Sequence, residues 1–312
     1  MNFLITGGAG FIGLALTNYW LAQGHHVRVL DDLSAGDERQ RMDTRALFTR
    51  GDVRDKPKLW SLLHDIDCVV HLAARVSVPE SVLYPIEYNE VNVGGTVSLM
   101  AAMRDAGVQR VVLASSGAIY GEQPQQPVSE SVMVNPQTPY AVSKLAAEQY
   151  VLAIGAQCKI ETVILRLFNA YGPGQPLPPA HPPVIPRFLK QIIGGGSLMV
   201  NGGGRQTRDF VYIDDVVRAL ALAAQTPALN RVILNVGSGR ETSISQLIDT
   251  MEGVVGRGAH RLERANEGGV SRLVADVRRA QKVIDWTPRV ELAEGLRQMT
   301  VKDERFKLKQ LA

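Results

Sequence analysis

The glycine-rich segment at the start of the chain constrains its fold more than any other feature. An apolar run at residues 2–6 leads directly into Gly7, Gly10 and Gly13, and an apolar-periodic stretch follows as far as Leu21. This order predicts a strand, a tight turn and a helix. Glycines at these places allow the turn, bring backbone close to a pyrophosphate, and direct the phosphates to the positive N-terminus of the helix. The segment therefore predicts a dinucleotide-binding site.

A second predicted strand, residues 26–30, ends in Asp31 and Asp32. An acidic side chain about 20 residues beyond the glycine turn can accept hydrogen bonds from the adenosine ribose and repels a 2′-phosphate. Arg28 lies before the acidic pair, so it does not argue for a phosphate pocket. The sequence thus favours NAD over NADP as the cofactor.

Apolar runs alternate with amphipathic segments along most of the chain, and helices are expected between most of the predicted strands. We expect strands near residues 2–6, 26–31, 46–50, 67–72, 110–114, 161–166 and 232–236. Such alternation predicts an α/β fold, a Rossmann-type doubly wound parallel sheet, with ligands beyond the carboxyl ends of its strands.

The composition changes after Asn169, where a proline-rich stretch runs to Pro186. Proline disrupts helices and ladders, so we expect a long loop there that acts as a binding lid. We predict that residues 1–169 form the NAD-binding Rossmann domain, which also receives about 210–236. Residues 170–312 would form mainly a second, smaller substrate-binding domain.

Tyr140 and Lys144 are four residues apart at the start of a predicted helix, with Ser115 and Ser116 upstream. Residues i and i+4 share a helix face, so the phenol and the ammonium are side by side. Moving a tyrosine pKa from ~10 to ~7 needs roughly 4 kcal/mol of phenolate stabilisation. The lysine and an oxidised nicotinamide ring could supply it, which would make the tyrosine a general base. In ordinary helices the same spacing reflects only a packed tyrosine and a solvated lysine.

The chain resembles the extended short-chain dehydrogenases/reductases, and within them the NAD-dependent nucleotide-sugar epimerase/dehydratase group. Both the order and the content of the motifs are similar along nearly the whole chain. The motifs are residues 6–13, 51–55, 71–74, 92–96, 115–121, 140–144, 166–174 and 208–215.

The resemblance implies an enzyme with roles at named positions. The implied catalytic residues are Ser116, Tyr140 and Lys144. The implied cofactor-binding residues are Gly7, Gly10, Phe11, Ile12, Gly13, Asp31, Asp32, Asp52, Val53, Leu72, Ala73, Ala74, Asn92, Tyr140, Lys144 and Phe168. The implied substrate-binding residues are Ser116, Asn169, Asn201 and Arg208.

The resemblance also implies a reaction, the NAD-dependent 4-epimerisation of a nucleotide diphosphate hexose through a transient 4-keto sugar. UDP-glucose and UDP-galactose, or their N-acetyl forms, are the expected substrates. Sugar dehydratases of this group place acidic residues where this chain has Gly117 and Ala118. The sequence therefore favours epimerisation; a dehydratase, a 4-ketoreductase or a non-catalytic dinucleotide sensor stays an alternative.

One departure from the group's pattern concerns the nucleotide diphosphate. Related proteins have an arginine and an acid before a Val-Ala-Asp segment, where this chain has Asn266 and Gly269. Either Arg264 or Arg272 could substitute, or the nucleotide could be held differently. Leu273 occupies the position that decides whether an N-acetyl group fits, and leucine allows both outcomes.

Composition limits the partners. The 312 residues are 45% hydrophobic and 21% charged with a net charge of +3, and the charges are interspersed, so no nucleic-acid-binding face is expected. The sequence contains no apolar run of ~18 residues, and its N-terminal residues do not resemble a signal segment. We therefore expect no membrane partner and a cytoplasmic location. The two cysteines lack metal-ligand spacing, and no metal is expected. Apolar stripes on the helices near 85–106 and 140–155 resemble those of relatives that form homodimers, although they could equally be internal core.

Overall fold

The computed structural model describes residues 1–265 and 270–308. Within them, seven parallel strands form a central sheet in the order β11-β6-β5-β4-β1-β2-β3. The strands are β1 (Asn2–Thr6), β2 (His26–Asp31), β3 (Leu47–Arg50), β4 (Cys68–His71), β5 (Arg110–Ser116), β6 (Glu161–Leu167) and β11 (Val232–Val236). The predicted Rossmann-type parallel sheet is confirmed, and each predicted strand lies where its apolar run indicated.

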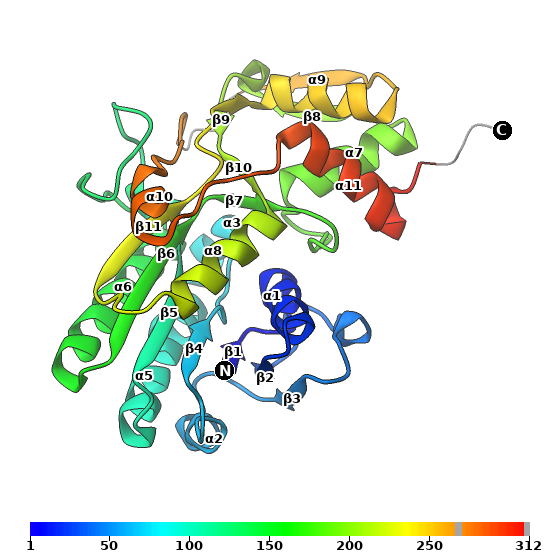
Figure 1. The fold of residues 1–312 in the computed structure, drawn as a ribbon. Helices are drawn as coiled ribbons and strands as arrows, with labels where there is room; N and C mark the ends of the chain where they lie inside the picture. The colour runs from blue at the N-terminus through cyan, green and yellow to red at the C-terminus, as the bar shows by residue number, and fades with distance from the viewer. Residues whose placement is uncertain (266–269, 309–312) are drawn as a thin grey trace.

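Helices cover both faces of the sheet (Figure 1). Phe3 in β1 belongs to the same buried cluster as Trp20, and their rings stack with centroids 3.7 Å apart. Leu4 faces the other way and packs in a cluster with Leu99 and Met103. This alternation follows from the two-residue period of a strand. The flanking helices are α1 (Phe11–Ala22) and α8 (Ile213–Gln225) on one face, and α2 (Lys56–Leu62), α5 (Gly95–Ala106) and α6 (Pro139–Cys158) on the other.

The strand register aligns the carboxyl ends at one edge. Thr6 at the end of β1 pairs with Leu30 and with His71, and Ser116 at the end of β5 pairs with Leu167. The glycine turn and the loops after β2, β4, β5 and β6 therefore meet at this edge, as the sequence predicted.

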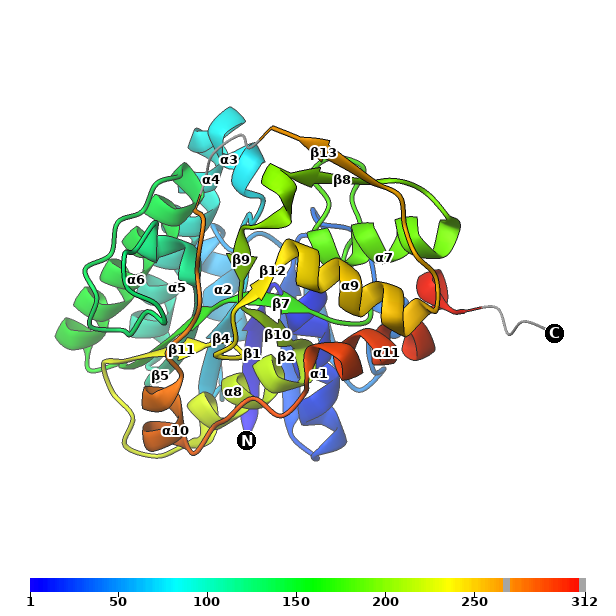
Figure 2. The same ribbon diagram turned by 90° about the horizontal axis from the view of Figure 1, so that it is seen from above.

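Short ladders and further helices form the rest of the chain. Strand β7 (Asn169–Tyr171) pairs with β10 (Phe210–Tyr212), β8 (Leu198–Asn201) with β13 (Arg261–Arg264), and β9 (Thr207–Arg208) with β12 (Thr242–Ser243). Helices α7 (Val184–Gly194), α9 (Ile244–Val255) and α11 (Leu292–Lys302) gather with β8 to one side of the sheet in both ribbon views (Figures 1 and 2). The domain boundary at residue 169 stays a prediction.

The long helix expected near 85–106 is interrupted. It consists of α4 (Pro85–Tyr88), a π-helix (Asn89–Gly94) and α5, and a short helix α3 (Val78–Leu83) precedes it. Single π-helical turns often occur at functional sites because they redirect side chains. The remaining helices are α10 (Arg278–Ile284) and the 3-10 helices η1 (Arg39–Arg41), η3 (Gly117–Tyr120), η4 (Gly202–Gly204) and η5 (Glu304–Phe306).

The proline-rich stretch is a loop from residue 172 to α7, as predicted. The Gly174 amide donates to the Asp303 carboxylate at 2.8 Å, and the Gln175 side chain donates to the Ala170 carbonyl at 3.0 Å. These contacts attach the loop to η5 and to β7. Its role as a lid stays a prediction.

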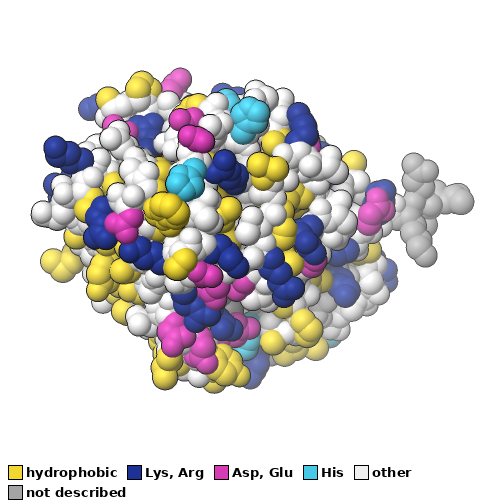
Figure 3. All heavy atoms as spheres, turned by 90° about the horizontal axis from the view of Figure 1, so that it is seen from below, with side chains coloured by type: hydrophobic (Ala, Val, Ile, Leu, Met, Phe, Trp, Pro, Cys, Tyr) yellow, Lys and Arg dark blue, Asp and Glu magenta, His cyan; other side chains and the backbone are white. Residues whose placement is uncertain are grey.

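Acidic and basic side chains are interspersed on the face shown in Figure 3. Among residues 1–265 and 270–308, no helix is long and apolar enough to cross a membrane. The same residues contain no group of three or more histidine, cysteine or acidic side chains placed to hold a metal ion.

Candidate active site

The turn between β1 and α1 is shaped by its glycines. Gly7 has a φ of 72°, in the left-handed region that favours glycine. A Cβ atom on Gly13 would lie 2.2 Å from the Gly7 carbonyl oxygen, and one on Gly7 would lie 2.6 Å from the Ala73 amide nitrogen. At Gly10, the cap position of α1, no described side chain bonds the first amides of the helix. Those amides are open to an anion, so the turn fits a pyrophosphate.

Asp31 supports this turn from the end of β2. Its carboxylate accepts the Ala9 amide at 3.0 Å and the Leu33 amide at 2.8 Å. Burial raises the pKa of Asp31, and these backbone hydrogen bonds oppose the rise. Asp32 is exposed and accepts the Ser34 amide at 2.9 Å. Of the two predicted acids, Asp31 is therefore the one beside the glycine turn, with carboxylate lone pairs left for a ribose.

The predicted adenine-binding pair lies after β3. Asp52 forms a 2.6 Å ion pair with Arg54, which also reaches Glu90 at 3.0 Å, and the bond with Arg54 lowers the pKa of Asp52. Val53 is buried, and a Cβ atom on Gly95 would lie 2.4 Å from its Cγ1 atom. This close contact fixes Val53 between β3 and α5.

Leu72, Ala73 and Ala74 form the start of the loop after β4 and are partly buried. The Leu72 amide donates to the Thr6 carbonyl at 3.0 Å. Because a Cβ atom on Gly7 would touch Ala73, this loop lies directly against the glycine turn. Phe11 and Ile12, at the start of α1, are partly buried and pack against the core cluster that contains Phe3 and Trp20.

Asn92 lies in the π-helix and is almost fully buried. Its side-chain oxygen accepts the Arg75 amide at 2.8 Å, and its nitrogen donates to the Arg75 carbonyl at 3.0 Å and to Ser143 Oγ at 2.9 Å. Asn92 therefore ties the loop after β4 to α6. A contact between Asn92 and a cofactor stays a prediction.

Tyr140 and Lys144 lie in the first turns of α6, on one face of the helix. Thr138 caps the helix by accepting the Ala141 amide at 3.2 Å. Tyr140 is 9% exposed and Lys144 is 6% exposed. Ser116, at the end of β5, lies close enough to Tyr140 to lower the pKa of its phenol. The structure thus brings the three predicted catalytic residues together at the carboxyl edge of the sheet.

Burial is the largest influence on the pKa values of Tyr140 and Lys144. It raises the pKa of Tyr140, and the hydrogen bond with Ser116 opposes the rise. It lowers the pKa of Lys144 to about 8, and the charge of Glu148 opposes the fall. At pH 7 Lys144 stays mostly protonated, whereas Tyr140 needs a further positive charge before it ionises.

His71 packs beneath the site as a neutral ring. Burial, followed by the charge of Lys144, lowers its pKa to about 3. Its ring nitrogens lie 2.6 Å from Thr6 Oγ1 and 2.9 Å from Thr96 Oγ1. These contacts link the end of β1 to α5. The threonine partners of this histidine had no recognisable signal in the sequence.

Phe168 closes the end of β6. A Cβ atom on Gly117 would lie 3.2 Å from its ring carbons. Phe168 is buried with Ile119 and Leu273 in a small separate cluster. The loop after β5 is therefore packed tightly over the catalytic strand end.

Asn169 and Arg208 lie near each other, at the start of β7 and the end of β9. The Asn169 side chain donates to the Asp209 carbonyl at 3.0 Å. The Arg208 guanidinium donates to the Thr207 carbonyl at 2.7 Å, and burial lowers its pKa while Glu122 opposes the fall. Asn201 ends β8, in a different ladder. The three predicted substrate residues thus lie in three separate two-stranded ladders, and within the described residues their side chains form no hydrogen bond with one another.

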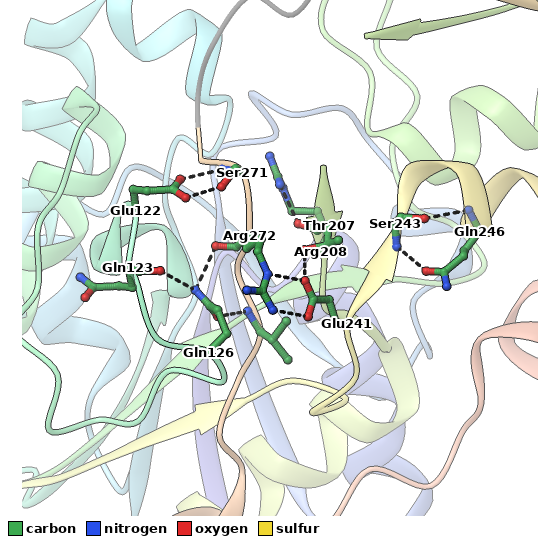
Figure 4. Close-up of polar contacts among 11 residues, drawn as sticks. Glu122, Gln123, Gln126, Thr207, Arg208, Glu241, Ser243, Gln246, Ser271 and Arg272 are labelled. Atoms are coloured by element: carbon green, nitrogen blue, oxygen red, sulfur yellow. Dashed lines mark hydrogen bonds and ion pairs between the residues drawn. The ribbon is translucent and has the colours of Figure 1, made fainter. Parts of the chain in front are cut away.

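Residues 271–276, here called the strap, run beside Arg208 (Figure 4). Arg272 in the strap forms two 2.7 Å bonds with the Glu241 carboxylate, which also accepts Thr207 Oγ1 at 2.8 Å. The bond with Arg272 lowers the pKa of Glu241 to about 2. Glu122 accepts the Ser271 amide at 2.6 Å and the Ser271 hydroxyl. Sequence reasoning missed both acids, which stand outside the recognised motifs.

The strap also bears on the departure noted in the sequence. Asn266 and Gly269 lie outside the described residues. The Arg272 guanidinium is engaged by Glu241 in this structure, so it would have to leave that pair to reach a phosphate. Leu273 is 7% exposed and belongs to the Phe168 cluster. Its influence on an N-acetyl group stays a prediction.

Comparison with known proteins gives consistent matches. Residues 3–237 match the model of the NAD dependent epimerase/dehydratase family. UDP-glucose 4-epimerase of Mycolicibacterium smegmatis is 38% identical over 304 residues, which cover 95% of this chain and 96% of that protein. UDP-glucuronate 4-epimerase of Thermodesulfobacterium geofontis is 33% identical over 311 residues, covering 95% and 94%.

Solved structures agree with the sequence comparison. UDP-glucose 4-epimerase of Thermotoga maritima, crystallised with UDP-glucose, superposes with a TM-score of 0.93. It is 32% identical, and the match covers 99% of this chain and 100% of that one. The likeness therefore extends over the glycine turn, helix α6 and the short strands alike.

Proposed function

The chain belongs to the NAD-dependent epimerase/dehydratase family, and from that premise we propose that it catalyses the 4-epimerisation of a UDP-linked hexose with NAD as its cofactor. The observation that carries the proposal is the trio of Ser116, Tyr140 and Lys144. Tyr140 lies near Ser116, which lowers the pKa of its phenol, and is one helical turn from the buried cation of Lys144. This is the arrangement that moves a proton at a sugar hydroxyl.

The three residues divide the work. Tyr140 takes the proton of the C4 hydroxyl as the C4 hydrogen leaves with its electron pair, and C4 becomes a carbonyl carbon. Ser116 hydrogen-bonds the reacting oxygen throughout. Lys144, protonated at pH 7, stabilises the tyrosinate. Bound NAD supplies the hydride acceptor and the positive ring whose charge completes the ionisation of Tyr140.

The return half of the reaction uses the same residues in reverse. The 4-keto sugar presents its other face, C4 recovers its hydride there, and Tyr140 returns the proton to the oxygen. No net oxidation occurs. Ser116, Asn169, Asn201 and Arg208 would hold the nucleotide sugar, with Arg208 the natural partner of the diphosphate because its buried charge lacks a recorded ion pair among the described residues.

The cofactor would lie along the carboxyl edge. Gly7, Gly10, Phe11, Ile12 and Gly13 would surround the pyrophosphate, Asp31 and Asp32 the adenosine ribose, Asp52 and Val53 the adenine, and Leu72, Ala73, Ala74, Asn92 and Phe168 the remainder. The fit rests on the glycine cradle, which any side chain at residue 13 would fill.

Epimerisation is favoured over dehydration by the residues beside Ser116. Dehydratases need an acid there to exchange protons at C5 and C6, and Gly117 and Ala118 cannot exchange one. An acid at residue 117 would also press on the Phe168 ring, because even a Cβ atom would lie 3.2 Å from it.

We also propose a cytoplasmic homodimer in which residues 1–169 bind the cofactor and the later residues mainly bind the substrate. Support for the dimer comes from apolar side chains on neighbouring helices. Val82 and Leu83 on α3, Ile86 on α4, and Val142 and Tyr150 on α6 are between 46% and 70% exposed. Sedimentation equilibrium would test the state, and Ile86→Glu should yield a monomer if this face is the interface.

The reaction is tested by incubating the purified chain separately with UDP-glucose, UDP-N-acetylglucosamine and UDP-glucuronate. We expect the galacto isomer of at least one of them by chromatography, without accumulating NADH. A persistent keto sugar would mean dehydration or reduction. No turnover of any nucleotide sugar would refute the proposal.

A further inference from the structure

A buried ion pair joins the catalytic helix to the sheet. Glu148 on α6 is fully buried, and Arg166 on β6 is 5% exposed in its side chain. Arg166 Nε and Nη2 donate to the two carboxylate oxygens at 3.1 and 2.8 Å. Arg166 also donates to the Tyr120 hydroxyl at 3.0 Å, and that hydroxyl donates to the Asn235 side chain at 2.7 Å. Both carboxylate oxygens and all three guanidinium nitrogens of the pair therefore have a hydrogen-bond partner.

Such a pair is poor evidence of a stabilising role, because removing two charges from water costs about as much as their attraction returns. Hydrophobic residues of similar volume often serve a core equally well. The position of Glu148 and Arg166 near Tyr140 and Lys144 suggests a role other than stability for this ion pair.

Glu148 lies four residues after Lys144, which lies four residues after Tyr140, so the three share one face of α6. Within residues 1–265 and 270–308 no ion pair or hydrogen bond is recorded for Lys144 Nζ. Both Glu148 oxygens are taken by Arg166. The carboxylate thus acts on Lys144 through space and leaves the donors of the ammonium group free.

We propose that Glu148 is a positioning residue that keeps Lys144 protonated, and that Arg166 prevents Glu148 from forming a direct salt bridge with Lys144. The proposal rests on the catalytic role given to Lys144 above. Attraction is strong here because the site excludes water and lowers the effective dielectric. Without Glu148, burial would shift Lys144 towards its neutral form. Without Arg166, Glu148 would form a direct salt bridge with the Lys144 ammonium group and occupy its N–H donors.

Other charged or titratable groups around Lys144 do not replace Glu148. His71 on β4 is neutral, since burial lowers its pKa to about 3. Burial raises the pKa of Tyr120 on η3 to about 12 and also raises the pKa of Tyr88 on α4, so both phenols are neutral. Burial lowers the pKa of Lys144 to about 8, and Glu148 is the group that opposes this fall.

The test compares Glu148→Gln with Arg166→Gln. The first measurement uses the chain freed of bound cofactor and follows urea unfolding from pH 7 to pH 10. Lys144 has a folded pKa of about 8, below its unfolded value of ~10.4, so folding stability rises with pH across that interval. In Glu148→Gln the rise should begin about one pH unit lower, and in Arg166→Gln it should begin higher.

The second measurement is the pH profile of kcat/KM. We expect the alkaline limb to move about one unit lower in Glu148→Gln. In Arg166→Gln the alkaline limb should stay or move higher while kcat falls, because a Lys144 ammonium group in a salt bridge with Glu148 no longer stabilises the Tyr140 phenolate. A purely structural role predicts lower stability in both variants with no opposite shift. Equal or absent shifts would overturn the proposal.

Two further variants keep the test decisive. If a single variant does not fold, the double variant Glu148→Gln with Arg166→Gln removes the buried carboxylate and the buried guanidinium together, so neither is left without the other. Its alkaline limb should still move lower, because Glu148 is the charge that opposes the fall in the pKa of Lys144. Glu161→Gln is the control, since Glu161 pairs with Arg110 at 2.9 Å where β6 and β5 begin, at the other end of β6 from Arg166, and its loss should leave both pH profiles unchanged. If no nucleotide sugar reacts yet the unfolding shifts appear, the proposed reaction fails and the charge assignment stands.

Discussion

Alanine at Gly13 should close the pyrophosphate cradle from within. The new Cβ atom would lie 2.2 Å from the Gly7 carbonyl oxygen and 2.5 Å from Gly8 Cα, both backbone atoms. Contacts this short cannot be relieved by a side-chain rotation, so the turn and helix α1 must separate. Inserting a methyl group into a packed region costs about 1–3 kcal/mol.

The same substitution also gains helix propensity, worth about 0.5–1 kcal/mol. The net loss in the free energy of unfolding should be up to about 2.5 kcal/mol, a drop of several degrees in Tm at most. Displacing the turn should weaken NAD binding at least ~10-fold, which corresponds to ~1.4 kcal/mol.

Gly253→Ala is the matched control. Gly253 lies in the interior of α9, is exposed, and would have no atom within 4 Å of a new Cβ. It should gain stability from helix propensity alone and leave NAD binding unchanged. Thermal unfolding and calorimetric titration with NAD, after removal of any retained cofactor, measure both effects. Equal stability and equal affinity of the two variants would refute the reasoning from the glycine cradle.

Three other outcomes are expected from single residues. Tyr140→Phe should lower kcat by about 10²–10⁴-fold, whereas Tyr19→Phe should not; unchanged turnover would remove Tyr140 from the mechanism. Arg208→Met should raise KM at least ~10-fold, because a charge-assisted hydrogen bond to the substrate is lost. Arg205 is exposed, and Arg205→Met should have little effect. Equal KM values for the two variants would argue against a diphosphate at Arg208. His71 has a folded pKa of about 3, below its unfolded value of ~6.5. The free energy of unfolding should therefore fall as pH drops from 6.5 towards 3, by up to ~1.4 kcal/mol per pH unit. A His71→Gln variant with the same pH slope in urea unfolding would contradict this.

The sheet could be predicted from the sequence because its signals are local. Each strand is an apolar run bounded by polar or glycine residues, and burial on both faces leaves little room for other patterns. The glycine spacing at Gly7, Gly10 and Gly13 reflects contacts between residues close in the chain. The Tyr140 and Lys144 pair is likewise set by helix geometry alone.

Other parts depend on contacts between distant segments, which a single sequence does not show. The pairing of β7 with β10 joins residues about 40 apart, and the bonds of Glu122 and Glu241 to the strap depend on how loops fold back. The hydrogen bonds by which Asn92 braces the loop after β4 likewise had no signal in the sequence, and its contact with a cofactor stays a prediction. Such bonds follow from backbone positions that only the folded chain defines.

Arg166 did have a signal in the sequence, because it is a charge that directly follows the apolar residues 163–165 within a buried strand. A charge buried in a sheet needs a partner, so its presence predicts an acid on a covering helix. Glu148, two helical turns after Tyr140, is the acid that meets it. In the proposed arrangement Glu148 offsets part of the cost of burying protonated Lys144, and Arg166 offsets the cost of burying Glu148. A site that must hold an ionised tyrosine away from water thus extends its charge balance through α6 into β6, beyond the residues that touch the sugar.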